Sequence, residues 1–262
     1  MMSLDTGPSA LGDRIDLWLA YYDEFAQEAP RLLDLLNESE RQQQARFHFA
    51  DDRLRYLVTR AMVRTVLSRY ADVNPADWTF DTNAYGRPEI ASAHSAAKTL
   101  CFNLSHTRGL IVLGVCREFA MGVDVEQQER AAALEVAERF FSPTEAAELA
   151  ALAPERQLSR FFDYWTLKES YIKARGMGLS IPLDRFSFDF PSRDTVRLSL
   201  DASLGDDARR WRFWQLNLPG NYKLAVCHER TVGMERTPSL RRMNTLDSFE
   251  ILTPDWVRAS GG

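Results

Sequence analysis

The sequence has few cysteines, no long apolar run and no excess of positive charge, and each absence excludes a class of protein. Its three cysteines, Cys101, Cys116 and Cys227, are odd in number and lack metal-ligand spacing, so neither a disulfide framework nor a zinc site is indicated. No stretch of about 18 apolar residues is present, which excludes a membrane-spanning helix. A net charge of −5 argues against general nucleic-acid binding, which needs a basic surface.

The composition that remains is that of a globular protein. The 262 residues are 45% hydrophobic and 26% charged, enough for one large domain or two smaller ones, each with a core. Residues 1–12 lack the basic, apolar and small-residue order of a signal peptide. We therefore expect a cytoplasmic protein whose cysteines are reduced and act as small hydrophobic residues.

The chain reads as two units of the same kind, residues 13–118 and residues 119–229. Each begins with a strand-like run, continues into segments with helical spacing and closes with a group of strand-like runs. In the first unit the helical spacing covers residues 39–70. In the second it covers residues 131–139, 142–152 and 158–175, with Ser142 and the glutamate three residues later as a helix start and Gly176 as a stop. This order predicts an α+β fold with two similar domains packed side by side as a pseudo-dimer. The polar remainder, residues 230–262, is expected to be a tail that wraps over the surface or is disordered.

An acidic motif, Gly-Val-Asp-Val-Glu, closes the first strand of the second unit at residues 122–126. Side chains alternate across a strand, so Val123 and Val125 face one side while Asp124 and Glu126 project together from the other. A strand end of this kind presents two carboxylates to a single point.

A second motif, Trp-Thr-Leu-Lys-Glu-Ser-Tyr-Ile-Lys, spans residues 165–173 in a segment with helical spacing. Glu169 and Lys173 are one turn apart and lie on the same helix face. If the two motifs converge, three carboxylates and a lysine share one site. Such a set suits Mg²⁺ on a pyrophosphate, because Mg²⁺ prefers oxygen ligands and keeps substrate phosphates in its shell.

Simpler interpretations of both motifs stay open on spacing alone. Asp124 and Glu126 could form the solvated face of an edge strand. Glu169 and Lys173 could form an ordinary helix pair, which contributes about 0.2–0.5 kcal/mol.

A polar cluster ends another strand at residues 102–106, Phe-Asn-Leu-Ser-His, where Ser105 and His106 could contact a phosphate. A histidine at a strand end is otherwise structural. Arg87 lies in the segment Tyr-Gly-Arg-Pro, which by itself indicates only a turn. Guanidinium groups suit phosphate and adenine recognition, and several lie near the first helical region. These are Arg41, Arg46, Arg53 and Arg55.

Three motifs in this order, at residues 102–106, 122–126 and 165–173 with the trailing residues 176–179, resemble the 4′-phosphopantetheinyl transferases of the larger, surfactin-synthetase-activating type. The resemblance covers roughly residues 41–227. It implies a monomeric pseudo-dimer that transfers the phosphopantetheine arm of coenzyme A to a serine of an apo acyl or peptidyl carrier protein. The reaction would depend on Mg²⁺ and release adenosine 3′,5′-bisphosphate, with no nucleic acid or membrane as partner.

The resemblance also implies roles for particular residues. Asp124, Glu126 and Glu169 would hold Mg²⁺, with Asp124, Glu169 and Lys173 as the catalytic group. The residues implied to bind coenzyme A are Arg55, Arg87, Ser105, His106, Lys168 and Lys173. The chain departs from its relatives at Glu40 and Gln43, where they carry lysines, and at Arg87, where some carry lysine.

The chemistry of the residues is consistent with this reaction. Serine attack on a pyrophosphate needs charge neutralisation and positioning, which a metal and Lys173 would supply. The nucleophile belongs to the partner, which accounts for the lack of a Ser/His/Asp arrangement in the chain. Glu169, at the expected junction of metal and attacking group, is the candidate general base.

Two rival functions are open on the sequence. One is a non-catalytic module that binds coenzyme A or a carrier protein, although binding alone does not require three carboxylates around a lysine. The other is a different Mg²⁺-dependent phosphoryl or nucleotidyl transferase, which a nucleoside triphosphate would stabilise better than coenzyme A.

Overall fold

The computed structural model describes residues 11–129, 133–231 and 235–261. The first unit contains a strand, three α-helices and four further strands, in this order: β1 Asp16–Tyr21, α1 Ala29–Asp34, α2 Glu38–Arg46, α3 Ala50–Leu67, β2 Phe80–Thr82, β3 Pro88–Ile90, β4 Leu100–Thr107 and β5 Leu110–Arg117. The second unit repeats the order: β6 Met121–Gln127, α4 Ala133–Phe140, α5 Pro143–Ala151, α6 Pro154–Arg175, β7 Phe186–Asp189, β8 Thr195–Leu200, β9 Trp211–Leu218 and β10 Tyr222–Glu229. Residues 131 and 132, expected to begin a helix, lie outside the described residues.

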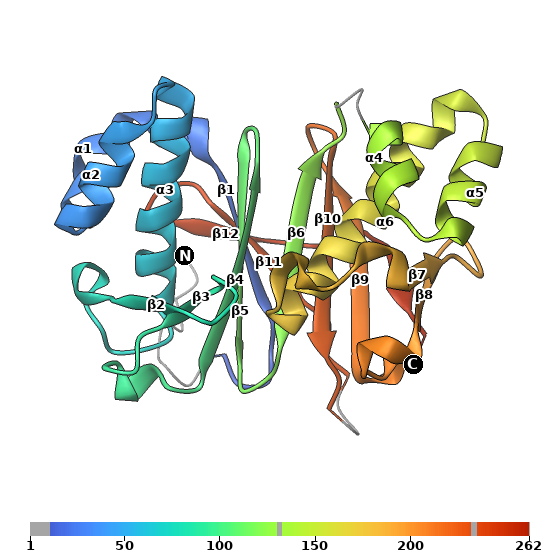
Figure 1. Ribbon diagram of the computed structural model, residues 1–262. Coiled ribbons are helices and arrows are strands. Elements are labelled where there is room, and N and C mark those ends of the chain that lie inside the picture. The colour runs from blue at the N-terminus through green and yellow to red at the C-terminus, as the bar shows by residue number, and fades with distance from the viewer. Residues whose placement is uncertain (1–10, 130–132, 232–234, 262) are drawn as a thin grey trace.

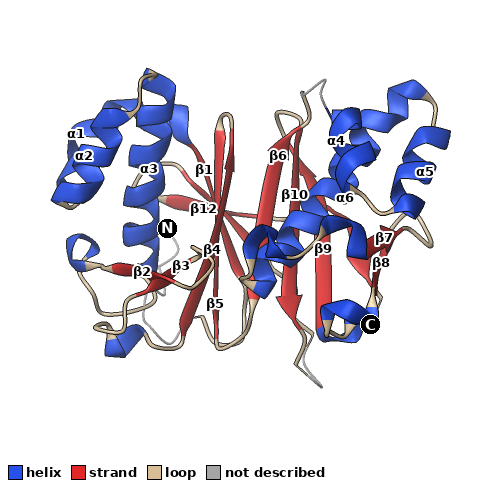
Figure 2. Cartoon of the chain, in the orientation of Figure 1, coloured by secondary structure: helices blue, strands red, loops and turns tan. Residues whose placement is uncertain are grey.

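Two sheets form the centre of the molecule, and helices cover their outer faces (Figure 1, Figure 2). The five-stranded sheet has the order β12-β11-β1-β5-β4, and the six-stranded sheet has the order β6-β10-β9-β13-β8-β7. A small hairpin of β2 and β3 stands apart from them. The two sheets and their helices are the predicted pair of α+β units.

Alternating side chains divide the apolar residues into three cores. Alternate residues of β1 and β5, such as Trp18 and Leu113, pack under α3, and the corresponding residues of β9 and β10, such as Phe213, pack under α6. The opposite faces of both sheets join in a third core, which contains Leu17 and Val123. Because β1, β5, β6 and β10 are buried on both faces, the two halves cannot separate without exposing this third core to water.

Local signals in the sequence set the ends of the helices. Asn37 and Ser142 cap α2 and α5, and each forms a capping box with the glutamate three residues later. Gly176 ends α6 with a φ of 65°, a conformation that disfavours residues with a Cβ. These ends agree with the sequence interpretation at residues 142 and 176.

The expectation of a loose tail after residue 229 is wrong. Three strands lie there: β11 Ser239–Met243, β12 Phe249–Leu252 and β13 Trp256–Ser260. β11 pairs in parallel with β1 in the first sheet, whereas β13 lies between β9 and β8 in the second. The last part of the chain therefore completes both sheets. Its several arginines concealed this role, because charged side chains are typical of a solvent-exposed segment.

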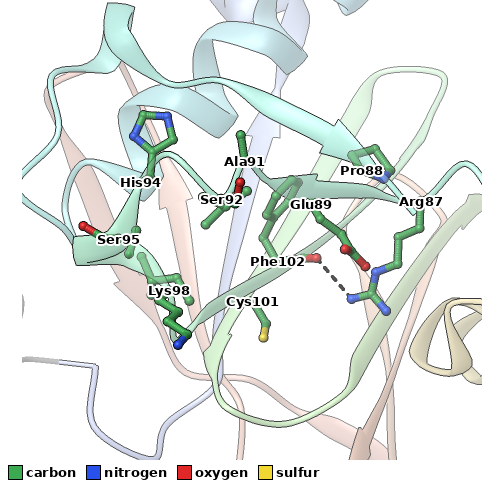
Figure 3. Close-up of a pocket in the computed structure, with 13 residues that line it drawn as sticks. Arg87, Pro88, Glu89, Ala91, Ser92, His94, Ser95, Lys98, Cys101 and Phe102 are labelled. Carbon is green, nitrogen blue, oxygen red and sulfur yellow. Dashed lines mark hydrogen bonds between the residues drawn. The ribbon is translucent and has the colours of Figure 1, made fainter. Parts of the chain in front are cut away.

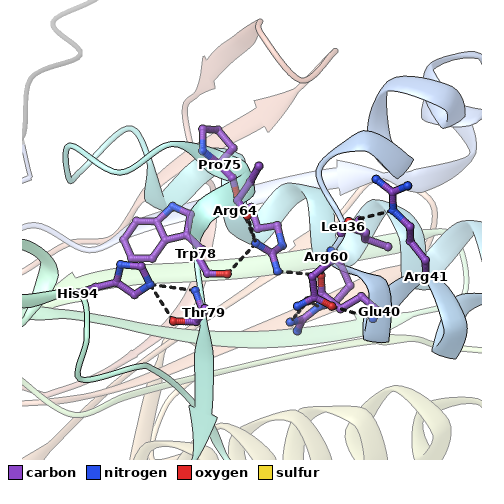
Figure 4. A network of polar contacts seen from close by, with 11 residues as sticks. Leu36, Glu40, Arg41, Arg60, Arg64, Pro75, Trp78, Thr79 and His94 are labelled. Atoms are coloured by element: carbon purple, nitrogen blue, oxygen red, sulfur yellow. Dashed lines mark hydrogen bonds and ion pairs between the residues drawn. The ribbon is translucent and has the colours of Figure 1, made fainter.

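Glu40, one of the departures from the resemblance, joins α2 to α3 (Figure 4). It is 4% exposed and pairs with Arg60 and with Arg64, whose Nη2 lies 2.7 Å from Glu40 Oε2. Arg64 also donates to the carbonyl of Trp78 at 2.8 Å. The carboxylate is thus a buried structural partner for two guanidinium groups, a role that a lysine could not fill.

No helix in the described ranges is both long enough and apolar enough to cross a membrane.

Candidate active site

The acidic motif lies on β6, at the edge of the second sheet, and its side chains alternate as predicted. Val123 and Val125 are fully buried in the core between the sheets. Asp124, 4% exposed, and the partly buried Glu126 project from the opposite side, toward α6. Burial distinguishes Asp124 from a residue on a solvated edge, because a carboxylate without water needs partners of its own.

Gly122 allows α6 to pack directly on β6. A Cβ at this position would lie 2.1 Å from the carbonyl oxygen of Ser170 and 2.4 Å from the backbone nitrogen of Ala174. Both are backbone atoms of α6, so only a residue without a side chain fits. This close approach brings Glu169 and Lys173 alongside the carboxylates of β6.

Lys173 and Asp124 form the central ion pair of the site. Lys173 Nζ lies 2.6 Å from Asp124 Oδ1 and donates to Ser105 Oγ at 3.0 Å. The Ser105 hydroxyl in turn donates to the same Asp124 oxygen at 3.0 Å. The other oxygen, Asp124 Oδ2, is buried, and in the described part of the chain it has no hydrogen-bond partner. An acceptor oxygen in this state is suited to a cation or a donor from a ligand.

Side chains of β4 hold β6 in place across the boundary between the sheets. Three alternate residues of β4 are polar, and each accepts a hydrogen bond from the backbone N–H of one of three alternate residues of β6. The pairs are Asn103 with Val123 at 2.9 Å, Ser105 with Val125 at 3.2 Å, and Thr107 with Gln127 at 3.3 Å. Thr107 also donates to Glu126 Oε2 at 3.3 Å. This ladder satisfies the edge of β6 and fixes its two carboxylates relative to the first unit.

The carboxylates of β6 act on the ionisation of Glu169. Burial, Asp124 and Glu126 together raise the pKa of Glu169 to about 7, against the opposing effect of Lys173. Loss of hydration lowers the pKa of His106, and Arg55 and Lys173 lower it further. Two carboxylates, Asp124 and Glu126, therefore lie around Glu169. Two cations, Arg55 and Lys173, lie around His106.

The fit of these residues to a metal ion is partial in the described ranges. There, no group of three or more His, Cys, Asp or Glu residues is arranged to hold a metal. The donor types nevertheless match Mg²⁺, which prefers carboxylate oxygens. Asp124 offers a buried oxygen without a hydrogen-bond partner among the described residues. Two neighbouring carboxylates help to raise the pKa of Glu169. A divalent cation would relieve that repulsion.

Two predicted coenzyme A ligands lie beside this centre. Ser105 touches both Lys173 and Asp124, as described above. His106 points from β4 toward α3, where Arg55 pairs with Asp52 at 2.5 Å and Asp51 at 3.9 Å. Arg55 and His106 thus form a basic border on the side of the first unit.

The structure does not place Lys168 at the site. Its ammonium is fully buried on another face of α6, where it donates to the carbonyls of Leu183 and Phe186 at 2.8 and 2.6 Å and pairs with Glu145 at 2.8 Å. Burial lowers the pKa of Lys168, and Glu145 opposes that change. The prediction that it binds coenzyme A is therefore withdrawn, because the side chain faces the core with no route to a ligand.

Arg87 lies near the site, but its guanidinium binds backbone carbonyl groups. Its guanidinium donates to the carbonyl of Lys173 at 2.9 Å and to the carbonyl of Met121 at 3.3 Å. It also donates to the carbonyl of Phe102 at 3.3 Å (Figure 3). Asn83, at the start of the same turn, donates to the carbonyl of Gly176 at 2.9 Å. The turn thus holds the end of α6 against both sheets, so direct contact of Arg87 with a phosphate is not supported.

Sequence reasoning missed the roles of Asn103, Thr107 and Gly122. The signal for the first two was available, because polar residues occupy the alternate positions 103, 105 and 107 of this strand and therefore share one face. The role of Gly122 depends on the distance between a helix and a strand, which no local pattern encodes.

Comparison with known families agrees with this two-part arrangement. A family model described as 4′-phosphopantetheinyl transferase superfamily matches residues 120–227. A second, described as 4′-phosphopantetheinyl transferase, N-terminal, matches residues 18–117. Each match covers one unit of the fold.

Individual relatives are similar over most of their length. A 4′-phosphopantetheinyl transferase of Bacillus subtilis is 33% identical over 77% of this chain and 86% of its own. The ffp 4′-phosphopantetheinyl transferase of the same species is 34% identical over 86% of this chain and 93% of its own. The HetI 4′-phosphopantetheinyl transferase of a Nostoc species is 34% identical over 65% of this chain and 72% of its own.

Proposed function

This chain belongs to the 4′-phosphopantetheinyl transferase superfamily, and on that premise we propose the particular reaction that it catalyses. It moves the phosphopantetheine arm of coenzyme A to a serine hydroxyl of an apo acyl or peptidyl carrier protein. The reaction depends on Mg²⁺ and releases adenosine 3′,5′-bisphosphate. The observation that supports it most directly is the meeting of Asp124, Glu169 and Lys173 where the two units join.

Lys173 is assigned to the phosphate that is attacked. Contacts with Asp124 and Ser105 use two of the three N–H donors of its ammonium, and the third is assigned to a phosphate oxygen. Because Asp124 and Ser105 hold the ammonium before substrate arrives, little reorganisation is needed when charge develops on the phosphate.

The carboxylates have two assigned tasks. Asp124, Glu126 and Glu169 would hold Mg²⁺, which when bound neutralises charge on the pyrophosphate. Glu169 also accepts the proton of the carrier serine, directly or through a water molecule. Its position one helical turn from Lys173 places the base beside the group that binds the phosphate.

The basic border is assigned to the nucleotide part of coenzyme A. Arg55 on α3 lies close enough to His106 on β4 to lower its pKa, and the two side chains would contact the 3′-phosphate. To bind Arg55, the phosphate would have to compete with the carboxylates of Asp51 and Asp52, which pair with this arginine.

Intact-mass spectrometry tests the proposal. The purified protein is mixed with coenzyme A, Mg²⁺ and several apo carrier proteins, with and without a chelator. We expect the carrier to gain one phosphopantetheinyl group only when the metal is available. A carrier whose serine is replaced by alanine should gain nothing.

Variants of the enzyme separate the assigned roles. Glu169→Gln keeps the size of the side chain and should lose turnover even where coenzyme A still binds. Full turnover of this variant would remove Glu169 as the base. Binding of coenzyme A without transfer to any carrier would instead favour a binding module.

A further inference from the structure

A pair of cysteines spans the two strands that lead to the site. Cys101 on β4 and Cys116 on β5 are direct partners in the antiparallel register. The Cα atoms of directly opposite residues are about 4.5–5.5 Å apart, within the range of about 4.4–6.8 Å that a disulfide spans. The two cysteines are therefore placed for a bond without movement of the backbone, although both are free thiols here.

Only one of the two thiols can be reached from outside. Cys101 is partly exposed and lines a cavity of about 590 Å³ together with Arg87, His94 and Lys98 (Figure 3). Cys116 is fully buried. A cavity of this size accepts a small organic molecule, so a reagent would meet Cys101 first.

The pair is also chemically asymmetric. The neighbouring Cys116 thiol, and to a smaller extent Arg87, lower the pKa of Cys101 to about 6 against the opposing effect of burial. Burial raises the pKa of Cys116 well above its ordinary value. Cys101 is therefore the more readily ionised thiol of the pair, and the thiolate is the form that attacks a disulfide.

From the register and the cavity we propose that Cys101 and Cys116 form a dithiol that low-molecular-weight disulfides oxidise reversibly to a cross-strand disulfide. In the first step, Cys101 Sγ attacks one sulfur of the small disulfide, forms a mixed disulfide and releases one small thiolate. In the second step, Cys116 Sγ attacks Cys101 Sγ, and the second small thiol leaves with the proton of Cys116. Two protein thiols are oxidised and one small disulfide is reduced to two thiols.

The proposal is tested with glutathione disulfide on the reduced full-length protein. After denaturation and alkylation, the intact mass should show a loss of two hydrogens and a single alkylated cysteine, Cys227. A peptide map should join Cys101 to Cys116, and a reducing agent should reverse the change.

Variants distinguish the order of the steps. Cys116→Ala cannot complete the second step, so it should accumulate one glutathione on Cys101. Cys101→Ala should remain unmodified, because Cys116 is inaccessible. Cys227→Ala is the control and should behave like the wild type. Thermal unfolding checks that each variant is folded, and the peptide map of the wild type does not depend on any variant.

Several results would overturn the proposal. They are a wild-type protein that stays reduced under these conditions, a disulfide that includes Cys227, and a Cys101→Ala variant that is modified as fast as the wild type. Each would show that the register of β4 and β5 does not direct the exchange.

Discussion

Replacement of Gly122 by alanine should displace α6 from β6 and separate the two halves of the site. The added Cβ would lie 2.1 Å from the Ser170 carbonyl oxygen and 2.4 Å from the Ala174 nitrogen, whereas ordinary contacts begin near 3.4 Å. Both contacts are with the backbone, so no side chain can turn aside. The helix must therefore move away from the strand by roughly 1 Å, the scale of displacement that disrupts catalytic geometry.

Two magnitudes follow for Gly122→Ala. Overpacking of a core costs about 1–3 kcal/mol, which is less than the stability of a typical domain, so the variant should fold. A displacement of roughly 1 Å between catalytic groups lowers turnover by about 100-fold. We would measure phosphopantetheine transfer to a carrier protein and, separately, urea unfolding of the same preparation.

Gly114→Ala is the matched control on the neighbouring strand β5. Its Cβ would be crowded too, at 2.7 Å from a Met121 side-chain carbon and 2.9 Å from one of Val123, but these are side-chain atoms and not the backbone of α6. It should lose stability and keep most of its turnover. Similar turnover in both variants, or full turnover of Gly122→Ala, would refute the reasoning that this contact positions Glu169 and Lys173.

Three further predictions concern separate parts of the molecule. Asp124→Asn should lower turnover by about 100-fold and raise the Mg²⁺ concentration needed, and an unchanged Mg²⁺ titration would contradict its assignment. Lys168→Met should cost about 3–5 kcal/mol in urea unfolding, because Glu145 is left buried without its cation, while turnover of the folded enzyme stays within a few-fold. Burial lowers the pKa of His228 from 6.5 to about 4, so the unfolded chain takes up the proton first. The free energy of unfolding should be highest above pH 6.5 and fall by up to about 3 kcal/mol as the pH is lowered to 4. Urea unfolding at a series of pH values should show a smaller decrease for His228→Gln than for the wild type.

Much of the fold was accessible from local pattern. The alternation of Val123 and Val125 with Asp124 and Glu126 predicted which side chains share a face of the strand, and the structure agrees. Ser142 with its glutamate three residues later marked the start of a helix. These features depend on neighbours in the sequence, so the sequence is sufficient to find them.

The errors arose where the hydrogen-bond or ion-pair partners of a residue come from distant parts of the chain. Lys168 lies beside Glu169 in the sequence, but α6 directs it into the core, where Glu145 neutralises it. Arg87 was expected on a phosphate, and its guanidinium instead meets carbonyl groups from α6, β4 and β6. The strands after residue 229 escaped notice because their partners, β1 and β9, lie far earlier in the chain.

The sequence by itself determined that two α+β units of the same kind would form, and it singled out four candidate site residues: Asp124, Glu126, Glu169 and Lys173. Only the tertiary structure decided how they meet. The absence of a side chain at Gly122 lets α6 reach β6, and the polar ladder of β4 holds β6 against the first unit. Local propensity acts over a few residues, whereas the site is made by contacts between elements that are dozens of residues apart.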